Sequence, residues 1–538
     1  MKMVRKTPNC LLFIFTVIAL ATIGFFSINT IVEGRISSST KHLDRHIDSK
    51  LKQEGIKPSK QSKDAEFLRR LHLDLTGKIP TIEEVQDFLK DRSKDKRDKK
   101  IKQLIGSEPY LDYWSGIWVK WLVGRSNLNE DERMQLQTWV RDKLANNIPY
   151  DQFVKQLLSA EGDVRQNGAG NFFVRYDASA IDLTAQISRL FLGLPMQCAE
   201  CHDHKTEEWL QTDFYGVAAF FTGTRREGVY EKDERGRDRR VSYVIKDTEK
   251  GRISIPGEGN PISPRFLDGE AYEGSALKRR QALGEWITRK NNPYFSHATV
   301  NRIWAYFMGR GFVEPLDGFG EESPPTNPDL LDWLAEDFVI HGYDIQYLMR
   351  TILNSKAYQR TSETNNSNKD DETYYSHAYI KPLSAEQFFY SMLEATGFER
   401  SLEREKYIHE HGANWMNSMK RRYLDRFIFL LDNGEMEEIE AFNGTVPQAL
   451  MMINGSLVND SADHKERGSS LSHLLKTTRY PAERVEQLYL RILSRPPTTS
   501  EKTYFERYLK QSLYRNKVLA YEDLYWALLN SAEFALNH

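Results

Sequence analysis

Residues 64–75 read DAEFLRRLHLDL, and this stretch shows the pattern that repeats through most of the chain. Its apolar side chains Phe67, Leu68, Leu71 and Leu75 return at intervals of one to four residues. This spacing places them on one face of an α-helix, because the helix turns once in about 3.6 residues. The stretch therefore predicts an amphipathic helix that packs one face against a core.

The residues that follow predict where the next helix begins. Thr81 and Glu84 have the spacing of a capping box, and they come directly after Pro80. Helical spacing recurs further along the chain, for example in EPYLDYWSGIWVKWLV (108–123) and IQYLMRTILNSKAYQR (345–360). The sequence thus predicts a mainly α protein with a multi-helix body.

The helical pattern is interrupted between residues 222 and 274. Charged residues, Gly and Pro are dense there, and two short runs, 241–245 and 252–255, are rich in β-branched side chains. We expect a small β-rich insert between two helical parts. The expected organisation is a signal or membrane anchor (1–34), a polar tether (35–63), a first helical part (64–221), the insert (222–274) and a second helical part (275–538) with a linker near 361–376.

The N-terminus predicts export. Lys2, Arg5 and Lys6 precede the uncharged run CLLFIFTVIALATIGFFSI at residues 10–28. This run is longer than the apolar region of most secretory signals and close to the ~20 residues that span a bilayer as a helix. We favour an uncleaved anchor over a cleaved signal. The basic flank keeps the N-terminus in the cytoplasm, so the body is expected in the periplasm or cell envelope.

Composition and motifs exclude several classes of function. Lys and Arg number 74 and Asp and Glu number 76, so the chain of 538 residues has a net charge of −2 and no general attraction for nucleic acid. The serine-hydrolase, zinc-protease, Walker and Rossmann signatures are absent from the sequence. A hydrolase or nucleotide-dependent enzyme has no support, and enzymatic activity remains an open question.

One motif carries chemistry: Cys198-Ala-Glu-Cys201-His202 matches C-x-x-C-H, the attachment signature of a c-type haem. On a helical turn the two thiols and the imidazole face the same way, so the thiols can form thioethers while the histidine binds the iron. Three alternatives stay open. They are a Cys198–Cys201 disulfide, a metal site that uses His202 or His204 with both cysteines, and a pair of free thiols.

A sixth iron ligand cannot be chosen by sequence. Met196 and His204 lie too close to the motif along the chain to reach the opposite face of a haem. The sequence does not distinguish among four more distant candidates, and each of them is better interpreted as a core or surface residue than as an iron ligand. They are His297, Met308, His341 and Met349.

Two charged clusters give weaker signals. Glu314, Asp317, Glu321 and Glu322 share a Gly/Pro-rich loop and could chelate a cation or act as an acid pair, although a solvated loop is the better interpretation. A basic stretch between residues 225 and 240 could hold an anionic glycan, but its interleaved acids favour a solvated surface.

Several long motifs together resemble the planctomycete-type cytochrome family. They are FLRRLHLDLTGKIPTIEEVQDFL (67–89), QCAECHDHKTEEWLQTDFYGVAAFF (197–221), NPYFSHATVNRIWAYFMGRGFVEPLDGFG (292–320), PDLLDWLAEDFVIHGYDIQYLMRTILNSKAYQR (328–360) and ALLNSAEFALNH (527–538). The family pairs a cytochrome-c-like PSCyt domain of unknown function with a PSD domain of unknown function. The resemblance implies an exported, mostly helical protein whose first part is cytochrome-c-like and carries the motif. It implies no reaction.

These observations predict an exported, membrane-tethered protein that carries one covalent haem c through Cys198, Cys201 and His202, for electron transfer or redox sensing. We expect the membrane to be contacted through the N-terminal segment, and the partner to be a redox or envelope protein rather than nucleic acid. The alternative is a haem-free envelope scaffold or glycan-related binding protein with a structural Cys198–Cys201 disulfide.

Overall fold

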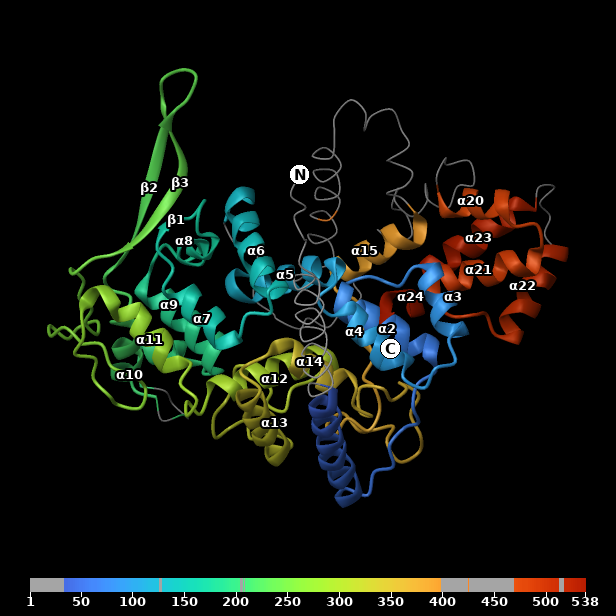
Figure 1. Cartoon of the computed structure of the whole chain (residues 1–538), viewed down its shortest axis with the longest axis horizontal. Helices are drawn as coiled ribbons and strands as arrows, with labels where there is room; N and C mark the ends of the chain where they lie inside the picture. Colours follow the sequence, from blue (N-terminus) through green and yellow to red (C-terminus); the bar gives the residue numbers. More distant parts are fainter. Residues whose placement is uncertain are drawn as a thin grey trace, which may run out of the picture.

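The computed structural model describes residues 33–124, 128–203, 207, 209–397, 424, 469–511 and 517–538. The described part is mainly helical with little sheet, which confirms the prediction of a mainly α protein (Figure 1). Residues 1–32, which include nearly all of the expected signal or anchor (1–34), lie outside it. Among the residues that the structure describes, no helix combines the length and the apolar character needed to cross a bilayer.

The buried apolar side chains form two hydrophobic cores. The larger core receives side chains from α2 (Asp64–Thr76), α3 (Ile82–Lys90), α4 (Lys96–Leu104), α5 (Glu108–Val123), α6 (Glu130–Ala145), α7 (Tyr150–Leu158), α8 (Asn171–Arg175), α9 (Ala180–Ile187), α10 (Gln211–Ala218), α11 (Arg279–Ile287), α12 (Phe295–Met308), α13 (Pro328–Ile340) and α14 (Ile345–Leu353). The smaller core is built by α15 (Ala385–Thr396), α20 (Ser470–Thr477), α21 (Pro481–Leu493), α22 (Thr499–Gln511), α23 (Val518–Leu529) and α24 (Ala532–Ala535).

Helix α2 is the helix predicted over 64–75, and it belongs to both cores. Phe67, Leu68, Leu71 and Leu75 pack into the larger core, as their spacing predicts, while Leu73 packs into the smaller one. All residues from 67 to 76 are buried. The predicted capping box at the start of α3 is also confirmed, since the Thr81 side chain accepts from the backbone N–H of residue 84 at 3.2 Å. Helix α2 is therefore the wall that the two cores share.

The cores do not divide the chain at the expected boundary near residue 275. Helices α11 to α14 lie beyond that boundary, yet Leu283, Trp304, Leu334 and Ile352 belong to the larger core. The division falls instead near residue 381, where strand β4 (Lys381–Pro382) pairs antiparallel with β5 (Leu536–Asn537). The spacing of apolar residues predicts which face of a helix is buried but not which helices it meets, and this explains the difference.

The expected polar tether at 35–63 is not a tether in the structure. Residues 33–53 are helical, and Leu43, Ile47 and Leu51 are buried in the larger core at helical spacing. The helix is also held by polar contacts, since the Arg350 guanidinium pairs with Glu33 at 2.8 Å. The composition predicted a tether because Ser and Lys residues dominate this segment, whereas only a few apolar side chains make the packing contacts.

The expected linker near 361–376 is likewise a packed segment without regular secondary structure. Asn368 and Ser376 are fully buried, and the chain runs beside residues 57–62. The Ser59 N–H donates to the Ser376 carbonyl at 2.8 Å, and the Asn368 amide donates to the Ser59 hydroxyl at 2.9 Å. These two polar segments satisfy each other's hydrogen bonds, so their polar composition does not make either of them loose.

The predicted β-rich insert is a long antiparallel hairpin of β2 (Thr224–Lys232) and β3 (Asp238–Asp247), which projects from the helical body in Figure 1. The run at 241–245 lies in β3, whereas the run at 252–255 makes only one isolated bridge, Ile253 to Ile262. Strand β1 (Gly162–Asp163) pairs with β3 and ties the hairpin to the larger helical body.

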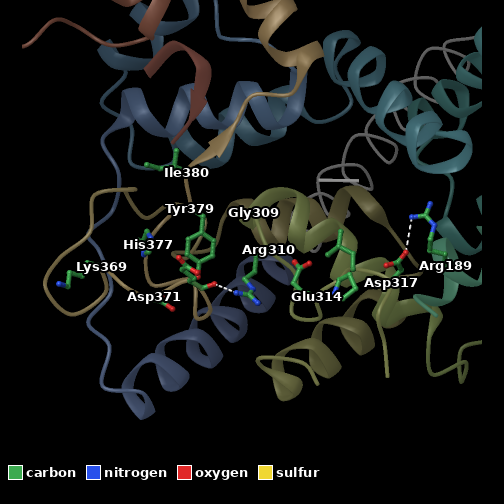
Figure 2. Close-up of a pocket in the computed structure, with 13 residues that line it drawn as sticks. Arg189, Gly309, Arg310, Glu314, Asp317, Lys369, Asp371, His377, Tyr379 and Ile380 are labelled. Atoms are coloured by element: carbon green, nitrogen blue, oxygen red, sulfur yellow. Dashed lines mark hydrogen bonds and ion pairs between the residues drawn. The ribbon is translucent and has the colours of Figure 1, made fainter. Parts of the chain in front are cut away.

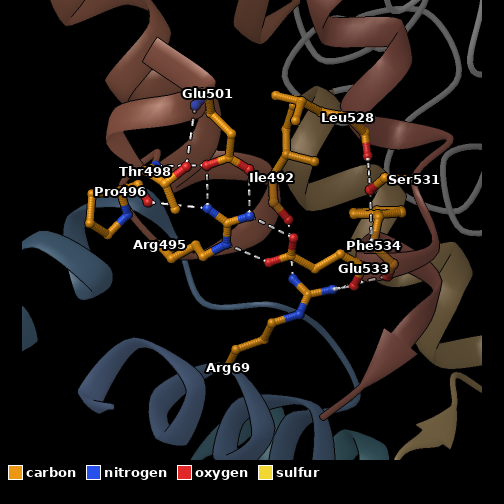
Figure 3. A network of polar contacts seen from close by, with 10 residues as sticks. All are labelled: Arg69, Ile492, Arg495, Pro496, Thr498, Glu501, Leu528, Ser531, Glu533 and Phe534. Atoms are coloured by element: carbon orange, nitrogen blue, oxygen red, sulfur yellow. Dashed lines mark hydrogen bonds and ion pairs between the residues drawn. The ribbon is translucent and has the colours of Figure 1, made fainter. Parts of the chain in front are cut away.

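A buried arginine joins α2 to the smaller core. Arg69 is 1 % exposed and donates to the carbonyls of Ile492, Glu533 and Phe534 (Figure 3). The Glu533 carboxylate in turn receives two hydrogen bonds from Arg495, at 2.6 and 2.7 Å. Three backbone acceptors compensate the burial of one guanidinium, and the C-terminal helices are thereby fixed against α2.

Candidate functional site

The Cys198-x-x-Cys201-His202 motif lies on an exposed turn. Residues Met196–Glu200 form the 3₁₀ helix η3, and Cys201 closes its last turn with an N–H that lies 3.4 Å from the Cys198 carbonyl. Met196 and Ala199 are fully buried, whereas both cysteines and His202 are exposed. Side chains three residues apart are eclipsed in a 3₁₀ helix, so the two thiols share one edge of the turn.

The chain enters this turn along a fixed path. Helix α9 continues as a π-helical segment, η2 (Ser188–Leu192), which ends at Gly193 with a φ of 69°. The Gly193 carbonyl accepts from the Phe319 N–H at 3.0 Å, and a Cβ atom on residue 193 would lie 2.6 Å from the Phe319 ring. A side chain does not fit at this position, so glycine allows the motif segment to lie against the loop around residue 319.

The chain leaves the turn under the N-terminus of α10. The Gln211 backbone N–H donates to the Asp203 carboxylate at 2.9 Å, and the Gln211 side chain donates to the Glu200 carbonyl at 3.0 Å. These contacts hold residues on both sides of Cys201 and His202. Tyr215 of the same helix is buried close to Cys201, and its burial raises the pKa of the phenol.

The imidazole of His202 is oriented by its own backbone. Its Nδ1 atom lies 2.7 Å from the Asp203 carbonyl oxygen. Because a carbonyl only accepts, Nδ1 is the donor in this contact, and in the neutral imidazole Nε2 is then the nitrogen with the lone pair. Metal-binding histidines commonly show this arrangement, in which the second ring nitrogen donates to a carbonyl or carboxylate. Cys198, Cys201 and His202 thus fit the attachment of a c-type haem, with two accessible thiols and an imidazole nitrogen ready to bind iron.

The structure bears on the alternatives to a haem at this motif, which are a disulfide, a metal site and a pair of free thiols. Both cysteines are free thiols, and no disulfide joins them. Among the described residues, no group of three or more His, Cys, Asp or Glu side chains is placed to hold a metal ion. His204, which was considered as a ligand, lies outside the described residues.

The distant candidates for a sixth iron ligand are engaged elsewhere. His297 Nε2 lies 3.0 Å from Asp332, and the His341 Nδ1 lies 2.8 Å from the Asp337 carbonyl while its ring stacks on Tyr347. The two distant methionines, Met308 and Met349, are buried in the larger core. No member of this set is placed by the structure as a partner of the motif.

A second candidate site is a pocket of about 800 Å³ beside the end of α12 (Figure 2). The sequence did not predict that its residues lie together. Two of the four acidic residues singled out by sequence, Glu314 and Asp317, line this pocket, whereas Glu321 and Glu322 do not. The polar residues that line it and were missed are Arg189, Arg310, Lys369, Asp371, Glu372, His377 and Tyr379. They are spread over nearly two hundred residues and share no spacing, so no local signal could have gathered them.

Comparison with known families matches two models to this chain. Residues 42–226 match PSCyt2, described as a protein of unknown function (DUF1549), and residues 279–509 match PSD1, described as a protein of unknown function (DUF1553). Together the two matches cover more than half of the chain, and the second runs across both hydrophobic cores. Comparisons with curated proteins and with solved structures give no significant match.

Proposed function

Because this chain belongs to the family that pairs a PSCyt2 domain with a PSD1 domain, we propose that it is an exported, membrane-tethered protein that carries one c-type haem for electron transfer or redox sensing. The observation that carries the proposal is the arrangement of Cys198, Cys201 and His202. Two free, exposed thiols lie on one 3₁₀ turn next to an imidazole whose Nδ1 is bonded to a backbone carbonyl.

Each residue has a distinct role in this proposal. The thiols of Cys198 and Cys201 would hold the haem covalently as thioethers, and the His202 imidazole would be its iron ligand. The Asp203 carbonyl orients that ring through Nδ1. A haem held in this way supplies one-electron redox chemistry. Gln211 keeps the turn in place through its contacts to Glu200 and Asp203.

The compartment supports the proposal from the sequence side. The basic flank and the apolar run at residues 10–28 are typical of exported chains. Fractionation of cells that express the full chain tests this part separately. We expect the protein in the membrane fraction, with its body accessible to protease added to the periplasmic side.

The haem itself is tested by expression of the full chain with a cytochrome c maturation system. We expect a Soret band and a haem-stained band that survives denaturing electrophoresis, and mass spectrometry that finds the added macrocycle on the peptide bearing residues 198 and 201. Cys198→Ala combined with Cys201→Ala should abolish covalent attachment. His202→Ala should shift the Soret band, whereas the control His297→Ala should leave the spectrum unchanged.

Two results would contradict the proposal. Colourless protein from the maturation system, together with an unmodified peptide, would show that the chain does not bind haem covalently. If the same peptide carried an oxidised Cys198–Cys201 pair, the haem-free envelope scaffold would replace the redox protein.

A further inference from the structure

The pocket beside α12 has walls from four separate segments. Gly309 and Arg310 follow the end of α12, residues 314–317 form a loop on one side, and residues 369–380 form the other side (Figure 2). Arg189 of η2 completes the wall. Its volume of about 800 Å³ lies within the range of small-molecule sites, and the pocket is open to solvent on one side. The motif cysteines do not line it, so its use does not depend on the haem.

Three polar side chains of the wall are each fixed through one atom to the backbone. Arg310 Nη1 donates to the Glu372 carbonyl at 2.7 Å, Glu314 Oε1 accepts from the Gly311 N–H at 2.6 Å, and the Tyr379 hydroxyl accepts from the Tyr375 N–H at 3.1 Å. No further hydrogen bond of these three side chains occurs within the described residues. Each therefore keeps hydrogen-bonding capacity while its position is already set, which lowers the entropy cost of binding.

The charges of the wall are mixed. Arg310 and Lys369 supply positive charge, and Glu314 supplies a carboxylate with an oxygen to spare. Of the other three carboxylates, Asp317 lies 3.5 Å from Arg189 and Asp371 accepts from the N–H groups of residues 373, 374 and 376. The third, Glu372, is exposed and adds a second available carboxylate, so two positive and two negative side chains face a ligand. A strongly anionic ligand would meet the carboxylates, and a cationic ligand would meet Arg310 and Lys369. The pocket therefore favours neither a cationic nor an anionic ligand.

A neutral ligand with many hydroxyl groups fits this wall. Each hydroxyl both donates and accepts, so it can pair with a guanidinium, a carboxylate or a phenol. Because Arg310 Nη1 and Glu314 Oε1 are already hydrogen-bonded to the backbone, the Nη2 group and the second carboxylate oxygen are the atoms that remain for hydroxyl groups. The Tyr379 ring and the Ile380 side chain, which is 54 % exposed, offer apolar surface for the C–H groups of a sugar ring.

We propose that the pocket lined by Arg310, Glu314 and Tyr379 binds a neutral oligosaccharide. The remaining polar atoms of these side chains, held in place by the backbone contacts, select for a ligand that supplies donors to Glu314 and acceptors to Arg310. The site is separate from the Cys198–Cys201 turn, and sugar binding goes beyond the redox function proposed above.

Isothermal titration calorimetry with the full chain tests the proposal. The probes are three neutral trisaccharides (cellotriose, maltotriose and xylotriose), the acidic trigalacturonate and the zwitterionic peptide trialanine. We expect at least one neutral trisaccharide to bind, and trigalacturonate and trialanine not to bind. Binding should persist in the Cys198→Ala, Cys201→Ala variant, which separates this proposal from the haem.

Two substitutions probe the wall directly. Glu314→Gln keeps an oxygen for the Gly311 N–H but turns the second acceptor into a donor, and Tyr379→Phe keeps the ring but removes the hydroxyl. Each should weaken binding about tenfold or more, which corresponds to the loss of one hydrogen bond to a charged or fixed group. The matched control is Glu321→Gln, an exposed residue of the same loop outside the pocket, and it should change affinity less than twofold.

The proposal is overturned if none of the neutral trisaccharides binds, or if trigalacturonate or trialanine binds in their place. It is also overturned if Glu314→Gln weakens binding no more than Glu321→Gln does. Thermal denaturation of every variant shows whether it is folded, so that a loss of affinity is assigned to the pocket.

Discussion

The ammonium group of Lys381 lies 2.9 Å from the carboxylate of Asp74, at the place where the two hydrophobic cores meet. Asp74 is 1 % exposed, and it also accepts from the Asn537 amide at 2.8 Å and the Tyr358 hydroxyl at 2.9 Å. Lys381 and Asn537 belong to the paired strands β4 and β5. One carboxylate on α2 therefore holds both strands that link the larger body to the C-terminal helices.

Replacement of Asp74 by Ala should destabilise the protein strongly. The change leaves the buried Asn537 amide and Tyr358 hydroxyl without this acceptor, and the Lys381 ammonium keeps only the Tyr306 and Phe307 carbonyls. Removal of one partner of a buried ion pair costs about 3–5 kcal/mol. Urea denaturation followed by circular dichroism measures the free energy of unfolding. The control Asp370→Ala removes a carboxylate that is 88 % exposed and should change stability by less than about 0.5 kcal/mol. Equal effects of the two substitutions would contradict a structural role for Asp74.

His72 should make the stability depend on pH. Burial lowers the pKa of His72 to about 4, although Glu84 lies 3.7 Å away. In the unfolded chain the pKa is about 6.5, so the unfolded state binds a proton between pH 6.5 and pH 4 that the folded state does not bind. The stabilisation that depends on a neutral, buried His72 is complete above pH 6.5 and is lost as the pH falls towards 4. It amounts to about 3 kcal/mol.

The measurement is the free energy of unfolding of the native protein and of His72→Gln at pH 7, 6, 5 and 4.5. Carboxylates with lowered pKa values that lie away from His72, such as Asp64, add a loss of stability at lower pH in both proteins and cancel in the difference between the two curves. The difference therefore reports His72 together with its neighbour Glu84. We expect the native protein to lose stability more steeply than the variant. Parallel curves would show that His72 is protonated in the folded state.

The parts of the fold that the sequence predicted correctly depend on local patterns. The apolar spacing of α2, the capping box at Thr81 and the β-prone run of β3 each act within a few residues of the chain. The expected tether and linker were wrong because their polar residues are satisfied by distant ones. Ser59 and Ser376 are hydrogen-bonded through their backbones although more than three hundred residues separate them in the sequence. The local composition of a segment does not predict such a contact.

The same distinction applies to the two candidate sites. Cys198, Cys201 and His202 were found because their spacing is itself the signal, and the structure adds that the Nδ1 of His202 is held by the Asp203 carbonyl. The pocket beside α12 was not found, because Arg189 and Tyr379 approach it only through the packing of the larger core. Of its wall, only the loop acids Glu314 and Asp317 gave a signal in the sequence.

Gly193 should be required for the position of the motif turn. Gly193→Ala places a methyl group 2.6 Å from the Phe319 ring in a backbone with a φ of 69°. The control Gly236→Ala has a φ of 71°, but nothing lies within 4 Å of its Cβ position. Both variants incur the cost of a left-handed alanine, about 1 kcal/mol, and only Gly193→Ala adds the contact with Phe319. Thermal denaturation should therefore show a larger loss for Gly193→Ala, and equal losses would contradict the contact.

The exposure of the motif cysteines predicts their chemical reactivity in haem-free protein. A thiol at the surface reacts without any change of fold, whereas a buried thiol reacts only after local opening. In reduced, folded protein we expect iodoacetamide to label Cys198 and Cys201 nearly as fast as in urea, as measured by mass spectrometry of the peptides. Ser188→Cys supplies a matched buried thiol, because Ser188 is fully buried and lies ten residues before Cys198. It should react at least about tenfold more slowly. Slow labelling of Cys198 and Cys201 would place them inside the body, and labelling that occurs only after treatment with a reductant would mean that a disulfide joins them. Either result would remove the accessible thiols on which covalent attachment of a haem depends.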